Sequence, residues 1–245
     1  MMRAEVTSPK FKGHVYFNGD EEAIKTVFGE IFGSEIYRKG LEYLLGIEKP
    51  IVVDCGAHVG VASLYFSTAD KCTIYALEPG KDSYEALLEN IKGKDNIKPL
   101  NVALRSLKGE SDFRANTKGG VGGNFYQIKG MEIETVKHIT IKDFMEEQKV
   151  DHIDLLKVDV EGSEYEIFLS QAFKDVENKI DMIVCESHNF PMHHNSIPFI
   201  LTNYDIEYMP EKNLVTKVTG TLMGETEQFE FDLKENTMFV ARRKK

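Results

Sequence analysis

Six residues that could bind a ligand, or act as acids and bases, follow short apolar runs in this sequence. They are Asp54, Glu78, Asp159, Glu161, Glu186 and His188. If the apolar runs are strands of a parallel sheet, their carboxyl ends lie at one edge, where such sheets bind ligands. Asp159 and Glu186 each end a buried run, so we expect them to be functional. Glu161 and Glu166 have a structural alternative, because acids near a helix N-terminus also stabilise the helix dipole.

The segment Asp54-Cys55-Gly56-Ala57-His58-Val59-Gly60 is typical of a turn that binds a nucleotide. Its glycines let a ligand approach the backbone, and the helix expected after it offers free N–H groups. The dinucleotide pattern G-x-G-x-x-G is absent. Asp54 would repel a pyrophosphate but suits S-adenosylmethionine, which has an ammonium, a sulfonium and no phosphate. Glu78 stands where a nucleotide-binding unit places its ribose carboxylate, so the sequence favours S-adenosylmethionine over NAD.

Strand-like and helix-like segments alternate along most of the chain. The strand-like segments are 51–53, 73–77, 96–104, 152–160, 180–185, the region of 206–208, and 237–241. This alternation predicts an α/β fold with an open, twisted, parallel sheet. Pro99 cannot donate a ladder hydrogen bond, which favours an edge position for the third strand, as in the order 3-2-1-4-5.

Local patterns predict further details of the helices and loops. Asp20 is expected to cap a first helix, and Ser163 with Glu166 is expected to form a capping box for a later one. The residues expected to face the core are Tyr84, Leu87, Leu88 and Ile91 in one helix and Tyr165, Phe168, Leu169 and Ala172 in another. The glycine-rich stretch 119–123 predicts either a hairpin tip or a loop that closes over the site.

The composition is typical of one medium-sized domain, with 245 residues, 42% of them hydrophobic and 29% charged. The longest apolar runs have only strand length and no signal peptide is evident, so no membrane partner is expected. A net charge of −10 opposes tight nonspecific binding to nucleic acid. Cys55, Cys72 and Cys185 form no close pairs, which predicts buried thiols in a reducing compartment and a cytoplasmic location.

Several of these segments together resemble the FkbM-type S-adenosylmethionine-dependent methyltransferases. They are the turn 54–60, Glu78-Pro79, Asn101-Val102-Ala103, the block D-L-L-K-x-D-x-E-G over 154–162, and Cys185-Glu186-Ser187-His188. The resemblance covers about 33–190, and the block over 154–162 is its most specific part. It implies a Rossmann-like class I methyltransferase fold. That fold has an open, mostly parallel seven-stranded sheet in the order 3-2-1-4-5-7-6, helices on both faces and small β-rich insertions.

With this fold, we expect residues 1–46 to form an N-terminal cap of a hairpin and helices before a methyltransferase domain over 47–245. The cap either covers one end of the sheet or forms part of a lid, with Tyr37 as a candidate contact. Substrate specificity is usually determined by the segments that match least, which here are the N-terminus and the part beyond Phe190.

The resemblance also implies O-methylation of a hydroxyl, often on a sugar or secondary metabolite, with S-adenosylmethionine as cofactor. The implied cofactor-binding residues are Asp54, Cys55, Gly56, Ala57, Gly60, Glu78, Pro79, Asn101, Val102, Ala103 and Asp159. Asp54 and Gly56 would hold the methionine end, Glu78 the ribose hydroxyls, Asn101 or Ala103 the adenine, and Asp159 would lie near the methyl group. An alcohol must lose its proton, so a base is expected among the catalytic candidates Asp159, His188, Glu186 and Glu161.

Other functions stay open at this point. His188, His193 and His194 with nearby acids could instead bind a divalent metal, although we expect no metal. Methylation of nitrogen in protein or nucleic acid is disfavoured, because Val160-Glu161-Gly162 stands where many such enzymes carry a proline-aromatic signature. A non-catalytic scaffold of the same fold is a further alternative. The expected partner is a small hydroxylated acceptor, and a homo-oligomer is a further possibility.

Overall fold

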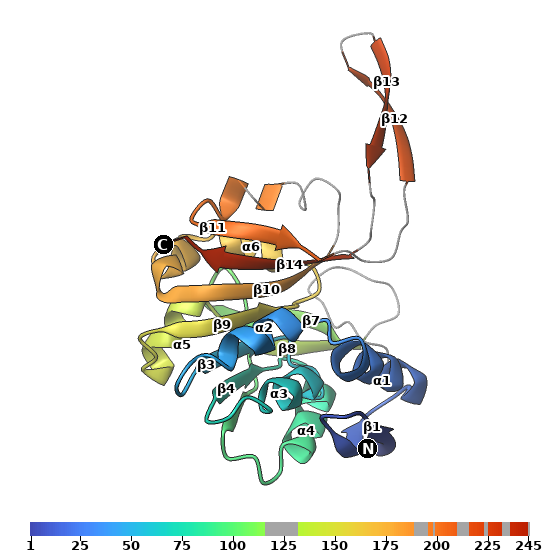
Figure 1. The fold of residues 1–245 in the computed structure, drawn as a ribbon, viewed down its shortest axis with the longest axis vertical. Helices are drawn as coiled ribbons and strands as arrows, with labels where there is room; N and C mark the ends of the chain where they lie inside the picture. The colour runs from blue at the N-terminus through green and yellow to red at the C-terminus, as the bar shows by residue number, and fades with distance from the viewer. Residues whose placement is uncertain are drawn as a thin grey trace.

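A seven-stranded sheet forms the centre of the protein in its computed structural model (Figure 1). The structure describes residues 1–115, 132–188, 196–197, 199–209, 216–222, 225–231 and 236–244. The sheet contains β3 (Ile51–Cys55), β4 (Thr73–Leu77), β5 (Ile97–Leu100), β9 (Ile153–Val158), β10 (Ile180–His188), β11 (Tyr204–Tyr208) and β14 (Asn236–Arg243). Its order is β11-β14-β10-β9-β3-β4-β5, and β14 is antiparallel to both of its neighbours. Numbered along the chain, this is the predicted order 3-2-1-4-5-7-6, so the predicted fold class is confirmed.

The third strand is shorter than predicted. As expected from Pro99, β5 lies at an edge of the sheet, but it ends at Leu100 instead of continuing to Leu104. The amide of Val102 donates to the carbonyl oxygen of Leu100, and this tight turn leads the chain out of the sheet. Ala103 then begins β6 (Ala103–Leu104), which pairs with β8 (Glu132–Ile139) beside β7 (Gly109–Ala115) in a second, three-stranded sheet.

Helices cover both faces of the central sheet, because its inner strands are apolar on both sides. One face packs against α2 (Arg38–Leu44), α3 (Val61–Phe66) and α4 (Lys81–Asn90), and α1 (Glu21–Phe28) adds Ile24 and Phe28 to the same core. The other face packs against α5 (Ile141–Gln148), α6 (Glu164–Leu169) and α7 (Gln171–Lys174), followed by the short turn η2 (Glu177–Lys179). Val52 belongs to the first core and Val53 to the second, as the two-residue period of a strand requires.

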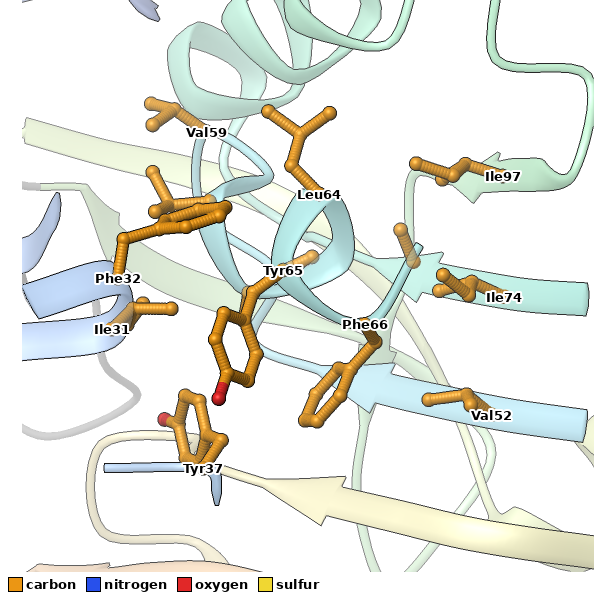
Figure 2. Close-up of a cluster of buried hydrophobic side chains, with 14 of the residues drawn as sticks. Ile31, Phe32, Tyr37, Val52, Val59, Leu64, Tyr65, Phe66, Ile74 and Ile97 are labelled. Carbon is orange, nitrogen blue, oxygen red and sulfur yellow. The ribbon is translucent and has the colours of Figure 1, made fainter. Parts of the chain in front are cut away.

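The N-terminal segment packs onto α3. The predicted hairpin is present as β1 (Met2–Thr7) and β2 (Lys12–Phe17), and α1 continues into a wider helical turn, η1 (Gly29–Gly33). Figure 2 shows Ile31 and Phe32 beside Tyr65, and the ring of Phe32 meets that of Tyr65 edge-on at 5.3 Å between centroids. The division of the chain after residue 46 stays a prediction.

Asp20 caps α1 as predicted, and Thr140 forms a capping box with Asp143 at the start of α5. The capping box predicted for Ser163 and Glu166 is wrong. The Ser163 side chain makes no cap hydrogen bond, and Glu166 instead pairs with Arg105 through two hydrogen bonds of 2.7 and 3.0 Å.

Two residues predicted to face the core are exposed. Leu88 lies on the outer side of α4, where Ala86 and Leu87 are the buried residues. Leu169 ends α6, which has only six residues and buries Ile167 and Phe168 instead. The six residues of α6 make fewer than two helical turns, which is too short for the apolar stripe predicted from Tyr165 to Ala172.

Toward the C-terminus, β12 (Thr216–Leu222) and β13 (Glu225–Phe231) form an antiparallel hairpin. Cys55, Cys72 and Cys185 are buried, free thiols, as predicted. The glycine-rich stretch 119–123 lies outside the described residues, and so do His193 and His194. None of the described helices has the length and hydropathy needed to cross a membrane.

Candidate active site

A buried lysine that the sequence analysis did not single out links the central strands at their carboxyl ends. Lys157 on β9 lies beside Asp54 on β3 in the sheet register, and both side chains are almost fully buried. The Nζ atom of Lys157 is 3.1 Å from Asp54 Oδ1 and 3.3 Å from Asp159 Oδ2. Burial alone would lower the pKa of Lys157, but the charges of Asp159 and Asp54 hold it well above its usual value. Lys157 is therefore a permanent cation inside the site.

Asp54 is held from two sides. Ser63 Oγ on α3 donates a 2.6 Å hydrogen bond to Asp54 Oδ2, while Oδ1 faces Lys157. Lys157 also donates to the backbone carbonyl oxygens of Cys55 and Gly56, at 3.3 and 2.8 Å. The Asp54–Lys157 pair therefore fixes the first residues of the turn between β3 and α3.

The turn itself depends on glycine. Gly56 has a φ of +75°, and a Cβ atom there would overlap the carbonyl oxygen of Asp159. Gly60 has a φ of +90°, and a Cβ atom there would lie 2.6 Å from Leu87 Cδ1. Burial lowers the pKa of His58 to about 4, so this imidazole is neutral at pH 7. Cys55 and Ala57 are buried, so the turn presents mainly backbone to a ligand.

Glu78, directly after β4, accepts two backbone hydrogen bonds. His58 N donates to Oε2 and Gly80 N donates to Oε1, each at 2.8 Å. Burial raises the pKa of Glu78 to about 7, although both hydrogen bonds favour the ionised form. Asn101 donates from Nδ2 to the carbonyl oxygens of Glu78 and Pro79, so its amide holds this segment in place. The sequence-predicted ribose carboxylate thus lies beside the glycine turn.

His188 at the end of β10 brings the remaining predicted residues together. Its Nε2 atom is 3.6 Å from Glu161 Oε2 and 3.7 Å from one oxygen each of Asp159 and Glu186. Its Nδ1 atom is 2.9 Å from Glu164 Oε1, a residue that the sequence analysis did not select. Burial opposes the charge on His188, but the hydrogen bond to Glu164 and the charges of Glu164, Asp159 and Glu161 raise its pKa to about 10.

Tyr37 completes the cluster, in which Glu161 has an unusual backbone conformation. Tyr37, from the segment before α2, is buried and donates from its hydroxyl to Asp159 Oδ2 at 3.4 Å. Burial raises the pKa of Glu161, an effect that the charge of His188 opposes. Glu161 has a φ of 55°, a left-handed conformation that is uncommon outside glycine and that brings its carboxylate toward His188.

One ligand atom each from Asp159, Glu161 and His188 lie within 4.8 Å of one another, a spacing that could hold a metal ion. The imidazole would have to give up its Nε2 proton first, because only a neutral nitrogen binds a metal. His152, Asp154 and Asp181 form a second such group at the opposite ends of the strands, where Arg243 pairs with Asp181.

The donor set at the strand ends fits S-adenosylmethionine better than a dinucleotide. Carboxyl groups outnumber the two cations, Lys157 and His188, so a pyrophosphate would be repelled. Glu78 is 7% exposed and offers carboxylate oxygens that accept hydrogen bonds, as the ribose hydroxyls require. The bare backbone at Gly56 leaves room for a ligand close to the turn.

Comparison with known proteins finds similarity to methyltransferases. The family described as "Methyltransferase FkbM domain" matches residues 54–208. The hexuronic acid methyltransferase AglP of Haloferax volcanii is 26% identical over 58% of this chain and 57% of its own length. The methyltransferase sdnD of Sordaria araneosa is 28% identical over 48% of this chain and 59% of its own length. The chain thus spans less than two thirds of these relatives.

Among solved structures, a precorrin-6Y C5,15-methyltransferase from Geobacter metallireducens is similar to this protein, with a TM-score of 0.49 and 14% identity. The alignment covers 98% of this chain and all of that one.

Proposed function

This chain belongs to the FkbM methyltransferase family, and we propose on this basis that it transfers a methyl group from S-adenosylmethionine to a hydroxyl oxygen of a sugar or another small metabolite. The observation that carries the proposal is the position of Glu78, a buried carboxylate beside a glycine turn that lacks the dinucleotide pattern. Such a site suits a ribose with two free hydroxyls and no attached phosphate.

The contacts around the glycine turn indicate which residues would bind each part of S-adenosylmethionine. Glu78 would accept the ribose hydroxyls, and Asn101 would keep the segment after β4 in place. Because Asp54 already faces Ser63 and Lys157, direct contact with the methionine end would fall to the backbone of the turn at Gly56 and to Asp159. Asp54 would then act by fixing Lys157 and the turn.

When bound, S-adenosylmethionine supplies a methyl group that its sulfonium already activates, so the protein contributes mainly alignment and proton removal. The candidate bases Asp159, Glu161, Glu186 and His188 lie together at the ends of β9 and β10, on the same edge as Glu78. Oxygen is the favoured target because Val160-Glu161-Gly162 follows β9, at the place where many nitrogen methyltransferases carry a proline-aromatic signature. The name of the Haloferax volcanii relative, a hexuronic acid methyltransferase, supports a sugar acid as the acceptor class.

Calorimetric titration tests the cofactor assignment. We expect wild-type protein to bind S-adenosylmethionine at pH 8 and to bind NAD far more weakly. Glu78→Gln should weaken S-adenosylmethionine binding by roughly tenfold to a hundredfold, because a charged acceptor contributes ~1.5–3 kcal/mol. Glu146→Gln is the matched control, because Glu146 is exposed near the end of α5, which leads into the start of β9 rather than its carboxyl end, and this variant should bind as the wild type does. Equal binding by Glu78→Gln, or preference for NAD, would refute the assignment.

The same titration should depend on pH through Glu78. Because burial raises the pKa of Glu78 to about 7, the carboxyl group is mostly ionised at pH 8 and mostly protonated at pH 6. If the ionised form is the binding form, affinity should fall about tenfold between these two values as the pH decreases. Glu78→Gln cannot titrate, so its weaker binding should lack this contribution. An identical pH dependence in both proteins would contradict the role of Glu78.

A further inference from the structure

Glu164 orients the imidazole of His188. The carboxylate lies at the start of α6 and is 1% exposed. Its Oε1 atom accepts hydrogen bonds from Val160 N at 3.1 Å and Gly162 N at 3.2 Å, and it is 2.9 Å from His188 Nδ1. Because Oε1 already accepts from two backbone N–H groups, the proton between the two side chains is assigned to Nδ1. The other ring nitrogen, Nε2, is thereby directed away from Glu164.

The Nε2 atom faces acids from two different segments. Asp159 and Glu161 follow β9, and Glu186 belongs to β10; each has an oxygen 3.6 to 3.7 Å from Nε2. The side chains of these acids are 23% to 34% exposed, whereas that of Glu164 is 2% exposed. The imidazole therefore connects a buried carboxylate with the open side of the site, an arrangement in which the outer nitrogen can exchange a proton.

Building on the proposed methyl transfer, we propose that His188 accepts the proton of the acceptor hydroxyl at Nε2 and that Glu164 is its positioning residue. We further propose that the sulfonium of S-adenosylmethionine, when it lies among Asp159, Glu161 and Glu186, causes His188 to release its proton. The Nε2 atom is then free to act as the base. The hydroxyl oxygen then forms a bond to the methyl carbon as the carbon–sulfur bond breaks. The electron pair of that bond stays on sulfur, and the hydroxyl proton moves to Nε2.

Charge balance in the cluster supports this sequence. Without a ligand, the acids hold His188 as an imidazolium, consistent with its raised pKa of about 10. A second cation close to the same acids makes that proton less favourable, so His188 loses it to solvent. After methyl transfer the sulfonium has become a neutral thioether, and the imidazolium is again the cation that the acids require. Besides the permanent cation Lys157, the acids around Nε2 thus face one positive charge before and after the transfer, either the sulfonium or the imidazolium.

The charged and titratable groups around His188 come from α6, from β9 and the residues after it, from β10 and from the segment before α2. Glu164 of α6 binds Nδ1, and Asp159, Glu161 and Glu186 face Nε2. Lys157 of β9 lies 3.3 Å from the far oxygen of Asp159, and the Tyr37 hydroxyl donates to that same oxygen. Both contacts weaken the electrostatic attraction between Asp159 and the imidazolium. Glu164 is the group that hydrogen-bonds directly to the ring.

Nuclear magnetic resonance can observe this proton directly, without an acceptor substrate. Protein labelled with ¹³C at the Cε1 position of histidine would be followed at pH 8.5, with His188→Gln used to assign the His188 signal. S-adenosylhomocysteine and S-adenosylmethionine are a matched pair, because they differ by the methyl group and its positive charge. We expect the imidazolium signal in the free protein and with S-adenosylhomocysteine, and the neutral signal with S-adenosylmethionine.

Glu164→Gln should lower the pH midpoint of His188 in the free protein by at least one pH unit. Glu166→Gln is the matched control on α6, since Glu166 pairs with Arg105 and should leave the midpoint unchanged. An unchanged midpoint in Glu164→Gln, or the same His188 signal with both nucleosides bound, would overturn this inference and leave the proposed function intact. Failure of both nucleosides to bind would instead overturn the proposed function, and this inference with it.

Discussion

Replacing Lys157 by methionine is expected to destabilise the fold by ~3–5 kcal/mol, because it leaves buried Asp54 without its counter-charge. The carbonyl oxygens of Cys55 and Gly56 lose a donor at the same time. Methionine nearly preserves the length and volume of the side chain, so the change removes charge rather than packing. Equilibrium unfolding in urea at pH 7 measures the loss.

The exposed Lys98 on β5 provides a matched control. Its Nζ atom lies over the ring of Tyr75, and Lys98→Met should change the free energy of unfolding by less than ~1 kcal/mol. The double variant Asp54→Asn/Lys157→Met should lose clearly less than the sum of its two single variants, because it leaves no unpaired charge at Asp54. Additive losses, or a Lys157→Met variant as stable as Lys98→Met, would show that the pair does not hold the turn.

Replacing Gly56 by alanine should also destabilise the protein strongly and abolish cofactor binding. The φ of +75° costs an alanine ~1–2 kcal/mol, and overlap of its Cβ with the Asp159 carbonyl oxygen adds ~1–3 kcal/mol. The atom that would have to move is backbone, and it belongs to Asp159, one of the acids around His188. The same urea unfolding measurement, followed by calorimetry with S-adenosylmethionine on the folded fraction, checks both consequences.

Gly93→Ala separates the two contributions. Gly93 has a φ of +76°, almost the same as Gly56, but a Cβ atom there would meet nothing within 4 Å. It should therefore show only the backbone cost of ~1–2 kcal/mol and retain full binding. Equal stability losses in the two variants would mean that the contact between Gly56 and Asp159 contributes nothing.

Much of the fold could be predicted because its signals are local. Near-continuous apolar runs such as 153–158 identify inner parallel strands, and Pro99 indicates an edge. The family resemblance supplied the last two strands of the order. The break after Leu100 was missed because the turn takes only the three residues from Leu100 to Val102, which is too short to interrupt the strand-like pattern. Leu88 and Leu169 were misplaced because a helical stripe does not reveal how much of it the sheet covers.

The site residues that directly follow strands could be predicted from the sequence. Those whose role depends on a partner distant in sequence were missed. Glu78 and His188 stand at strand ends, a position that the chain order reveals. Lys157 carried a signal that could have been used, since a lysine within an apolar central strand requires a buried acid beside it. Glu164 carried none, because its partners are set by the way the segment 159–163 folds back onto β10. The cytoplasmic location and the acceptor stay predictions.

Following the methyl group itself tests the proposed methyl transfer without a step in between. Purified protein would be incubated with S-adenosylmethionine carrying a radioactive methyl, together with small-molecule, protein and RNA fractions from the source cells. Glu78→Gln serves as the impaired control. We expect label in the small-molecule fraction, as an alkali-stable methyl ether on a hydroxylated compound, and much less of it with Glu78→Gln. Label in protein or RNA, or no transfer to any fraction, would contradict the proposed function.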